Sequence, residues 1–286
     1  MRPQLNPNGQ AVLALQNGTF KKFCCQAGMW EKDVYELYKQ HKKDCSWDNL
    51  TIAELEEQAD QEFREREHWK YIFALEDKSA IVCEAIPPFF FIIDEINRAE
   101  LSRVFGELMY CLEYRGPWEG LAETQYASLS NDETGMLKVS DGEYRFFIPH
   151  NVYIIGTMNN IDRSVESFDF ALRRRFRWER VNPSKEVLKN YLDNELKRWP
   201  ELAEWWESLN NMIAKQDLLG KDYCIGHAYL MQLEKFDENW NWKKVRQVIW
   251  DNSIQPLLEE YLRGTGEQGE DIKTKCKEAF FTTIAK

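Results

Sequence analysis

The feature that most constrains this chain is a short, continuous apolar run that ends in two acids. The run Phe89–Ile93 has the length of a strand and is followed directly by Asp94 and Glu95. An apolar run without polar alternation is typical of a strand covered on both faces, as in a parallel sheet. A second run, Val152–Thr157, has the same character. The sequence therefore predicts an α/β fold with a parallel sheet, in which the polar groups after the two strands would meet if the strands are neighbours.

Helical periodicity and turn signals organise the rest of the chain. Residues 30–80 carry two amphipathic patterns with a charged outer face, which predicts an inserted helical hairpin without chemistry. A probable turn at Asp141-Gly142 predicts a β-hairpin over about 136–148. Helical stripes predominate further on, so we expect an α/β unit over residues 1–182 and an all-helical unit over 183–286.

Two further expectations concern the ends of the α/β unit. The dipeptide Asn17-Gly18 is a strong hairpin-turn signal, so a return strand is expected to begin at Thr19-Phe20. A helical pattern at Ser167–Arg174 precedes the apolar segment Phe176–Val181, which is expected to form a third strand. Both would extend the β-structure of the unit.

Composition excludes several broad classes of protein. Lys+Arg number 37 and Asp+Glu 48, and the net charge of −11 argues against a generic basic protein that coats nucleic acid. No apolar run approaches the ~20 residues that a membrane-spanning helix needs, so no membrane role is expected. Seven cysteines without a CxxC pair or a signal peptide indicate reduced thiols and a cytoplasmic protein. The four histidines form no Cys/His cluster, which argues against structural zinc.

The polar residues after the two strands suit magnesium-nucleotide hydrolysis. Such chemistry needs one carboxylate that holds Mg²⁺ or its water and a second that orients the attacking water. Asp94 and Glu95 can supply both, and the alternative is a strand that ends at two surface acids. The amide of Asn159 can hold the attacking water, and the alternative is an Asn-rich turn that caps the next helix.

Three successive arginines form the third chemical element. Arg173, Arg174 and Arg175 lie beside an apolar segment, where their charges are costly to bury without anions. Phosphate matches the fork geometry of the guanidinium group, so a phosphate contact is the functional interpretation. A basic surface patch or a helix C-cap is the alternative.

Together, in this order and spacing, these elements resemble the AAA+ nucleoside triphosphatases and, more narrowly, the McrB family of modification-dependent restriction systems. The resembling segments are Phe91–Arg98 with Phe105–Leu108, Ile154–Ser164 and Phe168–Phe176, with Ile225–Tyr229 and Ile254–Tyr261 similar to the family's lid. The signature Met-Asn-x-x-Asp-Arg at Met158–Arg163 is specific to the family and its close relatives. The likeness covers nearly the whole chain except residues 30–80, and it implies a parallel AAA+ sheet followed by an all-helical lid.

The resemblance implies a role for each matching residue of the nucleotide site. Asp94 would be the Walker B acid that binds Mg²⁺, Glu95 the catalytic carboxylate, and Asn159 sensor 1. Asp162 and Arg163 would lie beside the nucleotide, which is GTP or ATP, with GTP favoured by the signature.

The resemblance also implies a ring and further partners. Arg174 and Arg175 would reach the γ-phosphate bound by a neighbouring subunit, which implies a ring, usually a hexamer. His227 of the lid is a weaker nucleotide-contact candidate, and a packed, hydrogen-bonded histidine is the alternative. An McrC-like nuclease subunit would be a partner, and DNA would be contacted only through missing or partner domains. The tryptophans of the lid allow two interpretations, a base-stacking surface and packing in the core or at a subunit interface, and we favour packing.

The sequence departs from the family at the phosphate loop. The motif G-x-x-x-x-G-K-[ST] does not occur in the 286 residues. The simplest interpretation is a chain truncated before its Walker B strand, without the first strand, phosphate loop and first helix. A separately encoded complement also stays open. So does a catalytically inactive scaffold subunit that donates Arg174 and Arg175 to an intact neighbour.

Overall fold

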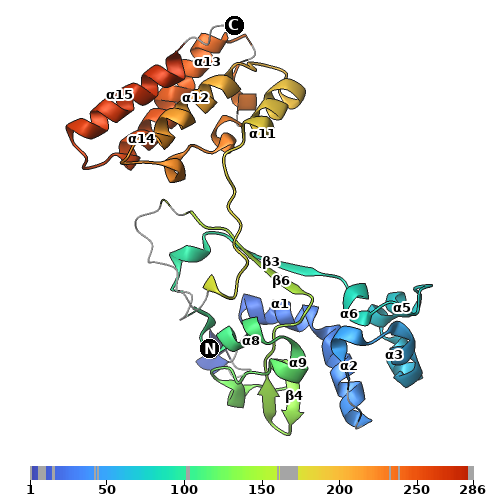
Figure 1. Cartoon of the computed structure of the whole chain (residues 1–286). Helices are drawn as coiled ribbons and strands as arrows, with labels where there is room; N and C mark the ends of the chain where they lie inside the picture. The colour runs from blue at the N-terminus through green and yellow to red at the C-terminus, as the bar shows by residue number, and fades with distance from the viewer. Residues whose placement is uncertain are drawn as a thin grey trace. The chain divides into compact units, whose positions relative to one another are not determined.

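The computed structural model describes residues 2–5, 11–14, 17–41, 43, 45–100, 104–159, 161, 173–231, 233–237 and 239–282. The chain divides into two compact units, Met1–Arg177 and Trp178–Lys286, where the sequence predicted a division between 182 and 183. Figure 1 shows the helices and strands of each unit. None of the helices in the described ranges is both long and apolar enough to cross a membrane.

A parallel pair of strands lies at the centre of the first unit. β3 (Phe89–Ile93) runs beside β6 (Val152–Gly156), with Phe89 opposite Val152 and Ile93 opposite Gly156 (Figure 1). Both apolar runs therefore form strands as predicted, and the two strands are direct neighbours. Because the pair is parallel, the residues that follow β3 and β6 emerge at the same edge.

The two faces of this pair differ. α1 (Thr19–Ala27) covers one face, where the Phe20 ring lies 4.9 Å from that of Phe91 and the Phe23 ring 5.8 Å from that of Phe89. The other face carries large apolar side chains that are 46% to 67% exposed, namely Phe90, Ile92, Tyr153 and Ile155. Among the described residues, the expectation that both faces are covered is therefore wrong.

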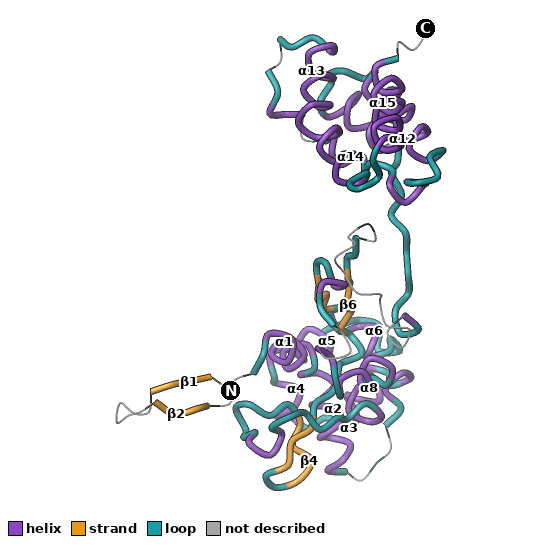
Figure 2. Tube along the Cα trace, turned by 90° about the vertical axis from the view of Figure 1, so that its left-hand side faces the viewer, coloured by secondary structure: helices purple, strands orange, loops and turns teal. Residues whose placement is uncertain are grey.

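The other strands form two separate antiparallel pairs (Figure 2). β1 (Arg2–Leu5) pairs with β2 (Ala11–Ala14), and β4 (Leu137–Ser140) pairs with β5 (Glu143–Arg145) around the predicted Asp141-Gly142 turn. The return strand expected at Thr19-Phe20 is wrong, because Thr19 begins α1. The helix is favoured because it places Phe20 and Phe23 on the sheet and buries Cys24 and Ala27.

Short helices with a core of their own replace the simple hairpin expected at 30–80. They are α2 (Met29–Gln40), η1 (Trp47–Asn49), α3 (Ile52–Gln58), α4 (Gln61–Glu65), α5 (Glu67–Phe73) and α6 (Val82–Ala85). Local caps divide them: Thr51 forms a capping box with Glu54, and Asp60 accepts the N–H of Phe63. Their core is largely aromatic and aliphatic and includes Trp30, Leu55, Phe63, Trp69 and Ile72.

Short helical turns connect β3 to β4. They are η2 (Ile96–Arg98), α8 (Leu108–Glu113), α9 (Gly116–Glu119) and η3 (Ala127–Leu129). Cys111 and Leu112 of α8 pack with Phe146, Phe147 and Val152 in the core beneath the sheet. This packing fixes the covered face of the strand pair.

The second unit is helical throughout its described elements. They are α11 (Lys185–Asn190), η4 (Tyr191–Glu195), α12 (Leu202–Ala214), η5 (Lys221–Tyr223), η6 (His227–Leu230), η7 (Leu233–Lys235), α13 (Trp242–Ile249), η8 (Trp250–Ile254), α14 (Gln255–Tyr261) and α15 (Glu267–Phe281). The third strand expected at Phe176–Val181 is wrong. That segment has no regular structure, because it joins the two units and has no neighbouring strand in the described residues. The wide turn η8 ends two residues before Pro256, whose missing N–H removes an ordinary helical hydrogen bond to the preceding turn.

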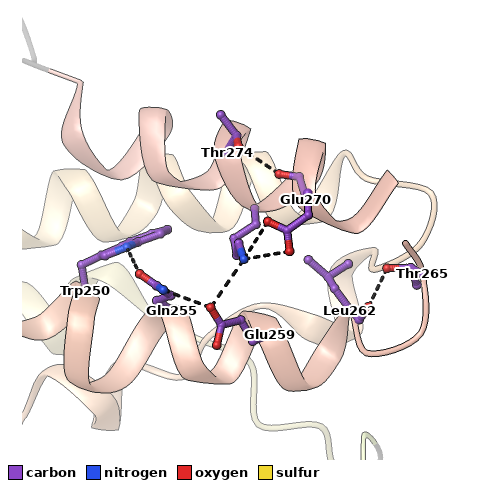
Figure 3. A network of polar contacts seen from close by, with 8 residues as sticks. Trp250, Gln255, Glu259, Leu262, Thr265, Glu270 and Thr274 are labelled. Atoms are coloured by element: carbon purple, nitrogen blue, oxygen red, sulfur yellow. Dashed lines mark hydrogen bonds and ion pairs between the residues drawn. The ribbon is translucent and has the colours of Figure 1, made fainter. Parts of the chain in front are cut away.

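The core of the second unit is rich in tryptophan. Trp205, Trp206 and Trp250 are at most 5% exposed and pack with aliphatic side chains from α12 to α15. A polar network lines one side of this core (Figure 3). The indole Nε1 of Trp250 donates to Gln255, Gln255 donates to Glu259, and Lys273 of α15 bonds both Glu259 and Glu270. Core packing of these tryptophans, rather than a base-stacking surface, therefore accounts for their burial.

Candidate functional site

The candidate site begins where β3 and β6 end. Asp94 and Glu95 follow β3, while Thr157 and Asn159 follow β6. The hydroxyl of Thr157 donates to the carboxylate Oδ1 of Asp94 and accepts the backbone N–H of Glu95 at 3.1 Å. The structure thus brings the predicted metal acid and catalytic acid into direct contact with the loop after the second strand.

Glu95 has an unusual backbone. Its φ of 52° lies in the left-handed region, which a residue with a Cβ adopts at some cost. This left-handed conformation turns the chain sharply between β3 and η2. The carboxylate of Glu95 lies 2.8 Å from Nε of Arg98, and both side chains are about half exposed. An ion pair this exposed is weak, so the carboxylate can leave it at little cost.

Asn159 is tied to the same edge through its backbone and its side chain. Its carbonyl oxygen accepts Nδ2 of Asn97 at 3.2 Å, and its own Oδ1 accepts the N–H of Ile161 at 3.1 Å. The second bond closes a local turn at Asn159, but the next helix, which such a turn was expected to cap, lies mostly outside the described residues, so the sensor role stays a prediction. The same bond holds the side chain so that Nδ2 is the atom that could donate to a ligand.

Close packing keeps the two loops together. A Cβ on Gly156 would lie 2.8 Å from Cδ1 of Ile96, so only a glycine fits there without movement. Ile96 is 5% exposed and its N–H donates to the carbonyl of Thr157 at 2.9 Å. The spacing between the loops is therefore set by packing as well as by hydrogen bonds.

The oxygen ligands at this edge suit Mg²⁺ that is bound together with a nucleotide, and they are too few to hold the ion alone. Carboxylate, hydroxyl and amide oxygens are the ligands that a hard cation prefers. Within the described ranges no cluster of three or more Asp, Glu, His or Cys side chains could hold a metal by itself. Mg²⁺ often uses one or two carboxylates and completes its coordination with phosphate oxygens and water, and Asp94 matches that pattern.

The two predicted finger arginines differ in their surroundings. Arg175 is 17% exposed at its side chain, and its Nη2 lies 2.9 Å from Glu113 of α8. Arg174 is exposed. Both belong to the first unit, and Arg174 is the one more open to a neighbouring molecule.

His227 lies in the second unit at the start of η6. Its Nδ1 accepts the backbone N–H of Ser184 at 3.2 Å, so the ring ties the entry of α11 to the loop before η6. The buried side chain of Asn210 holds the same loop through both the N–H and the carbonyl of Ile225. A hydrogen-bonded histidine was the alternative to a nucleotide contact, and the contact itself stays a prediction.

Asp162 and Arg163 lie outside the described residues, as does most of the helix expected at Ser167–Arg174. Thr157 is the site residue that sequence reasoning missed. Its polar side chain at the end of a predicted apolar strand was the available signal, while its contact with Asp94 depends on the register of β3 and β6, which the sequence does not reveal.

Two protein families are similar to parts of this chain. A family model for the AAA domain of the dynein-related subfamily matches residues 49–176, and a model for the alpha-helical lid domain of McrB matches residues 201–269. The first match includes both strands and the site, and it begins inside the segment interpreted as an insert. The second covers α12 to α14 and the turns between them.

Two curated relatives are similar to parts of the chain. The Type IV methyl-directed restriction enzyme EcoKMcrB subunit of Escherichia coli (strain K12) is 38% identical over 184 residues, which are 60% of this chain and 36% of that protein. The Type II restriction enzyme BsuMI component YdiS of Bacillus subtilis (strain 168) is 26% identical over 163 residues, 53% of this chain and 45% of that protein. The chain thus spans less than half the length of either relative.

The parallel strand pair with acids at its carboxyl edge, followed by a helical unit, defines an AAA+ protein with a lid. Within that class, the lid model and the identity to the Escherichia coli protein are specific. The chain is similar to the McrB family over residues 201–269, which the lid model matches, and over the 184 residues that are 38% identical to the Escherichia coli protein.

Proposed function

We propose that the chain is the nucleotide-hydrolysing motor part of an McrB-like, modification-dependent DNA restriction complex. The observation that carries the proposal is the meeting of Asp94, Glu95 and Asn159 at the carboxyl edge of two hydrogen-bonded parallel strands. Ligands of open α/β sheets bind outside this edge. The substrate in this proposal is GTP or ATP with Mg²⁺.

Each residue has a separate task in this mechanism. Asp94 would hold Mg²⁺, which when bound neutralises charge on the phosphate oxygens. Glu95 leaves its exposed ion pair with Arg98 and orients the attacking water. Asn159 donates from Nδ2 toward that water or the γ-phosphate, because its Oδ1 is occupied by Ile161. Asp162 and Arg163 complete the nucleotide site.

The same proposal includes a ring, and a hexamer is the form we favour. Arg174 would reach the γ-phosphate of a neighbour and offset charge in its transition state, with Arg175 beside it. A McrC-like nuclease subunit and DNA would be engaged through other domains or partners. His227 would contact the nucleotide from the lid. All seven cysteines are free, which supports a reducing, cytoplasmic location.

A scaffold subunit is the second candidate. It is favoured by the exposure of Arg174, which leaves that guanidinium group open to a neighbouring subunit. Such a subunit would not hydrolyse nucleotide itself. It would supply arginine fingers to a neighbour whose phosphate loop is intact.

Nucleotide turnover by the full chain tests the motor proposal. We expect magnesium-dependent hydrolysis of GTP or ATP, and Glu95→Gln should lower kcat by about 100-fold or more, the range for loss of a positioned acid or base. Glu133→Gln, which neutralises another exposed acid of the same unit, is the matched control and should leave kcat unchanged. Turnover that survives Glu95→Gln would refute the assignment of Glu95.

If the chain alone shows no turnover, mixing decides for or against the scaffold candidate. A relative with an intact phosphate loop should then hydrolyse nucleotide faster in the presence of this chain. Arg174→Ala should remove the stimulation. A mixture that behaves as the sum of its parts would exclude the scaffold candidate.

A further inference from the structure

The hydroxyl of Thr157 lies between the two acids of the candidate site. A threonine hydroxyl has one hydrogen to donate and lone pairs that accept. The backbone N–H of Glu95 can only donate, at 3.1 Å from Oγ1, so the hydroxyl hydrogen points to Oδ1 of Asp94. The direction of both bonds is therefore fixed by chemistry.

The backbone of Thr157 fixes the hydroxyl in place. Its N–H donates to the carbonyl of Ile93 at 3.0 Å, and its carbonyl accepts the N–H of Ile96 at 2.9 Å. Three groups of one residue thus bond the chain on both sides of Asp94 and Glu95. The branched Cβ restricts χ1 further, so the hydroxyl has little freedom to turn away.

We propose that Thr157 is a positioning residue for the metal-binding carboxylate. Its hydroxyl holds Oδ1 of Asp94, so that Oδ2 would be the oxygen left to hold Mg²⁺, and its bond to the Glu95 N–H supports the left-handed turn that places the second acid. This inference rests on the proposed function, since it assigns the metal to Asp94. Partners that orient a ligating carboxylate commonly change metal affinity 10- to 100-fold.

Mn²⁺ affinity of the full chain, measured by electron paramagnetic resonance with GTP present, tests the proposal. Thr157→Val keeps the branched shape but removes the hydroxyl, and it should weaken Mn²⁺ binding by about 10- to 100-fold. Thr157→Ser keeps the hydroxyl and should restore binding to near the original value. Thr157→Ala also removes the hydroxyl and has a smaller side chain than valine. It replaces Thr157→Val in the test if the valine variant does not fold.

Two controls separate the outcomes. Thr134→Val removes a hydroxyl that bonds Asn131 at 2.9 Å in the same unit, and it should not change Mn²⁺ affinity. Asp94→Asn should abolish the site. If Asp94→Asn weakens Mn²⁺ binding while Thr157→Val does not, Thr157 has no positioning role and the metal site stands. If Asp94→Asn binds Mn²⁺ as the unchanged chain does, the metal site of the proposed function is wrong, and the role of Thr157 is refuted with it.

Discussion

The parallel strand pair of the first unit and the helices of the second differ in how completely they bury apolar side chains. On the strand pair, Phe90 and Ile92 are 55% and 67% exposed while α1 covers only the opposite face. In the second unit, Trp250, Leu258 and Phe280 are fully buried, and the indole N–H of Trp250 begins a chain of hydrogen bonds through Gln255 to Glu259. The helical unit closes on itself, whereas the strand pair offers one of its faces for further packing.

This difference predicts where stability resides. A two-stranded sheet with one open face gains little from burial on that side, so the helices that flank it stabilise the first unit. The second unit has a core of its own and should unfold as a unit. Four substitutions test this contrast, beginning with the two that have the largest expected effects on stability.

Trp250→Ala should have the largest effect. The ring is fully buried and lies 5.8 Å from that of Phe280, so its loss should lower the unfolding free energy of the second unit by about 3–5 kcal/mol. Leu218→Ala, at a side chain that is 41% exposed, is the control and should cost far less.

Thiol alkylation in urea at pH 8 can follow each unit separately. Burial raises the pKa of Cys276 in the second unit and of Cys111 in the first to about 11, so both should stay unlabelled until their unit unfolds. Trp250→Ala should shift the urea midpoint of Cys276 and leave that of Cys111 in place. An equal shift of both midpoints would show that the units unfold together.

Glu31→Gln should have the next largest effect, confined to the first unit. Glu31 of α2 is 1% exposed, its Oε1 lies 2.5 Å from Nδ1 of His150, and burial raises its pKa. Loss of a buried, charged hydrogen-bond partner should cost about 1–3 kcal/mol, read from the Cys111 midpoint. Glu36→Gln, in an exposed pair with Lys32 on the same helix, is the control and should cost under about 1 kcal/mol. Equal costs of the two variants would show that the buried contact of Glu31 with His150 contributes no more to stability than the pair of Glu36 with Lys32.

Ile92→Ser tests the open face directly. Because Ile92 is exposed, its replacement should change the unfolding free energy by no more than about 0.5 kcal/mol, while self-association measured by sedimentation should fall. Phe91→Ser, on the face covered by α1, should destabilise the first unit much more. Equal costs at the two positions would mean that both faces are covered in solution.

Lys273→Gln should have the smaller effect of the two substitutions in the second unit. Lys273 joins Glu259 and Glu270 at the surface of the second unit (Figure 3), and such pairs contribute about 0.2–1 kcal/mol. The loss should diminish in high salt, because exposed charges are screened. Lys275→Gln, which breaks only an exposed pair with Asp271, is the matched control and should cost less still.

Elements with a strong local apolar pattern could be predicted from the sequence. Phe89–Ile93 and Val152–Gly156 were predicted as strands from their continuous apolar runs, although only one face of the pair is covered, and the acids after β3 marked the candidate site. The expected strand at Thr19-Phe20 failed because the hairpin signal of Asn17-Gly18 is local. Whether Phe20 belongs to a strand or a helix is decided by contacts with Phe91, which lies far along the chain.

Contacts between distant residues limited prediction of the site as well. Thr157 bonds Asp94 only because β3 and β6 are neighbours in a particular register, and no local pattern reveals that register. The pairing of Arg175 with Glu113 likewise depends on where α8 packs. The types of residue were therefore readable from the sequence, and their partners were not.

The close fit of Gly156 against Ile96 links two positions that are far apart in the chain. If residue 156 were randomised in a selection for function, glycine should be recovered unless position 96 is varied too. A smaller side chain at 96 should then permit alanine at 156. The two codons would evolve as a pair, because the spacing between the loops after β3 and β6 depends on both side chains.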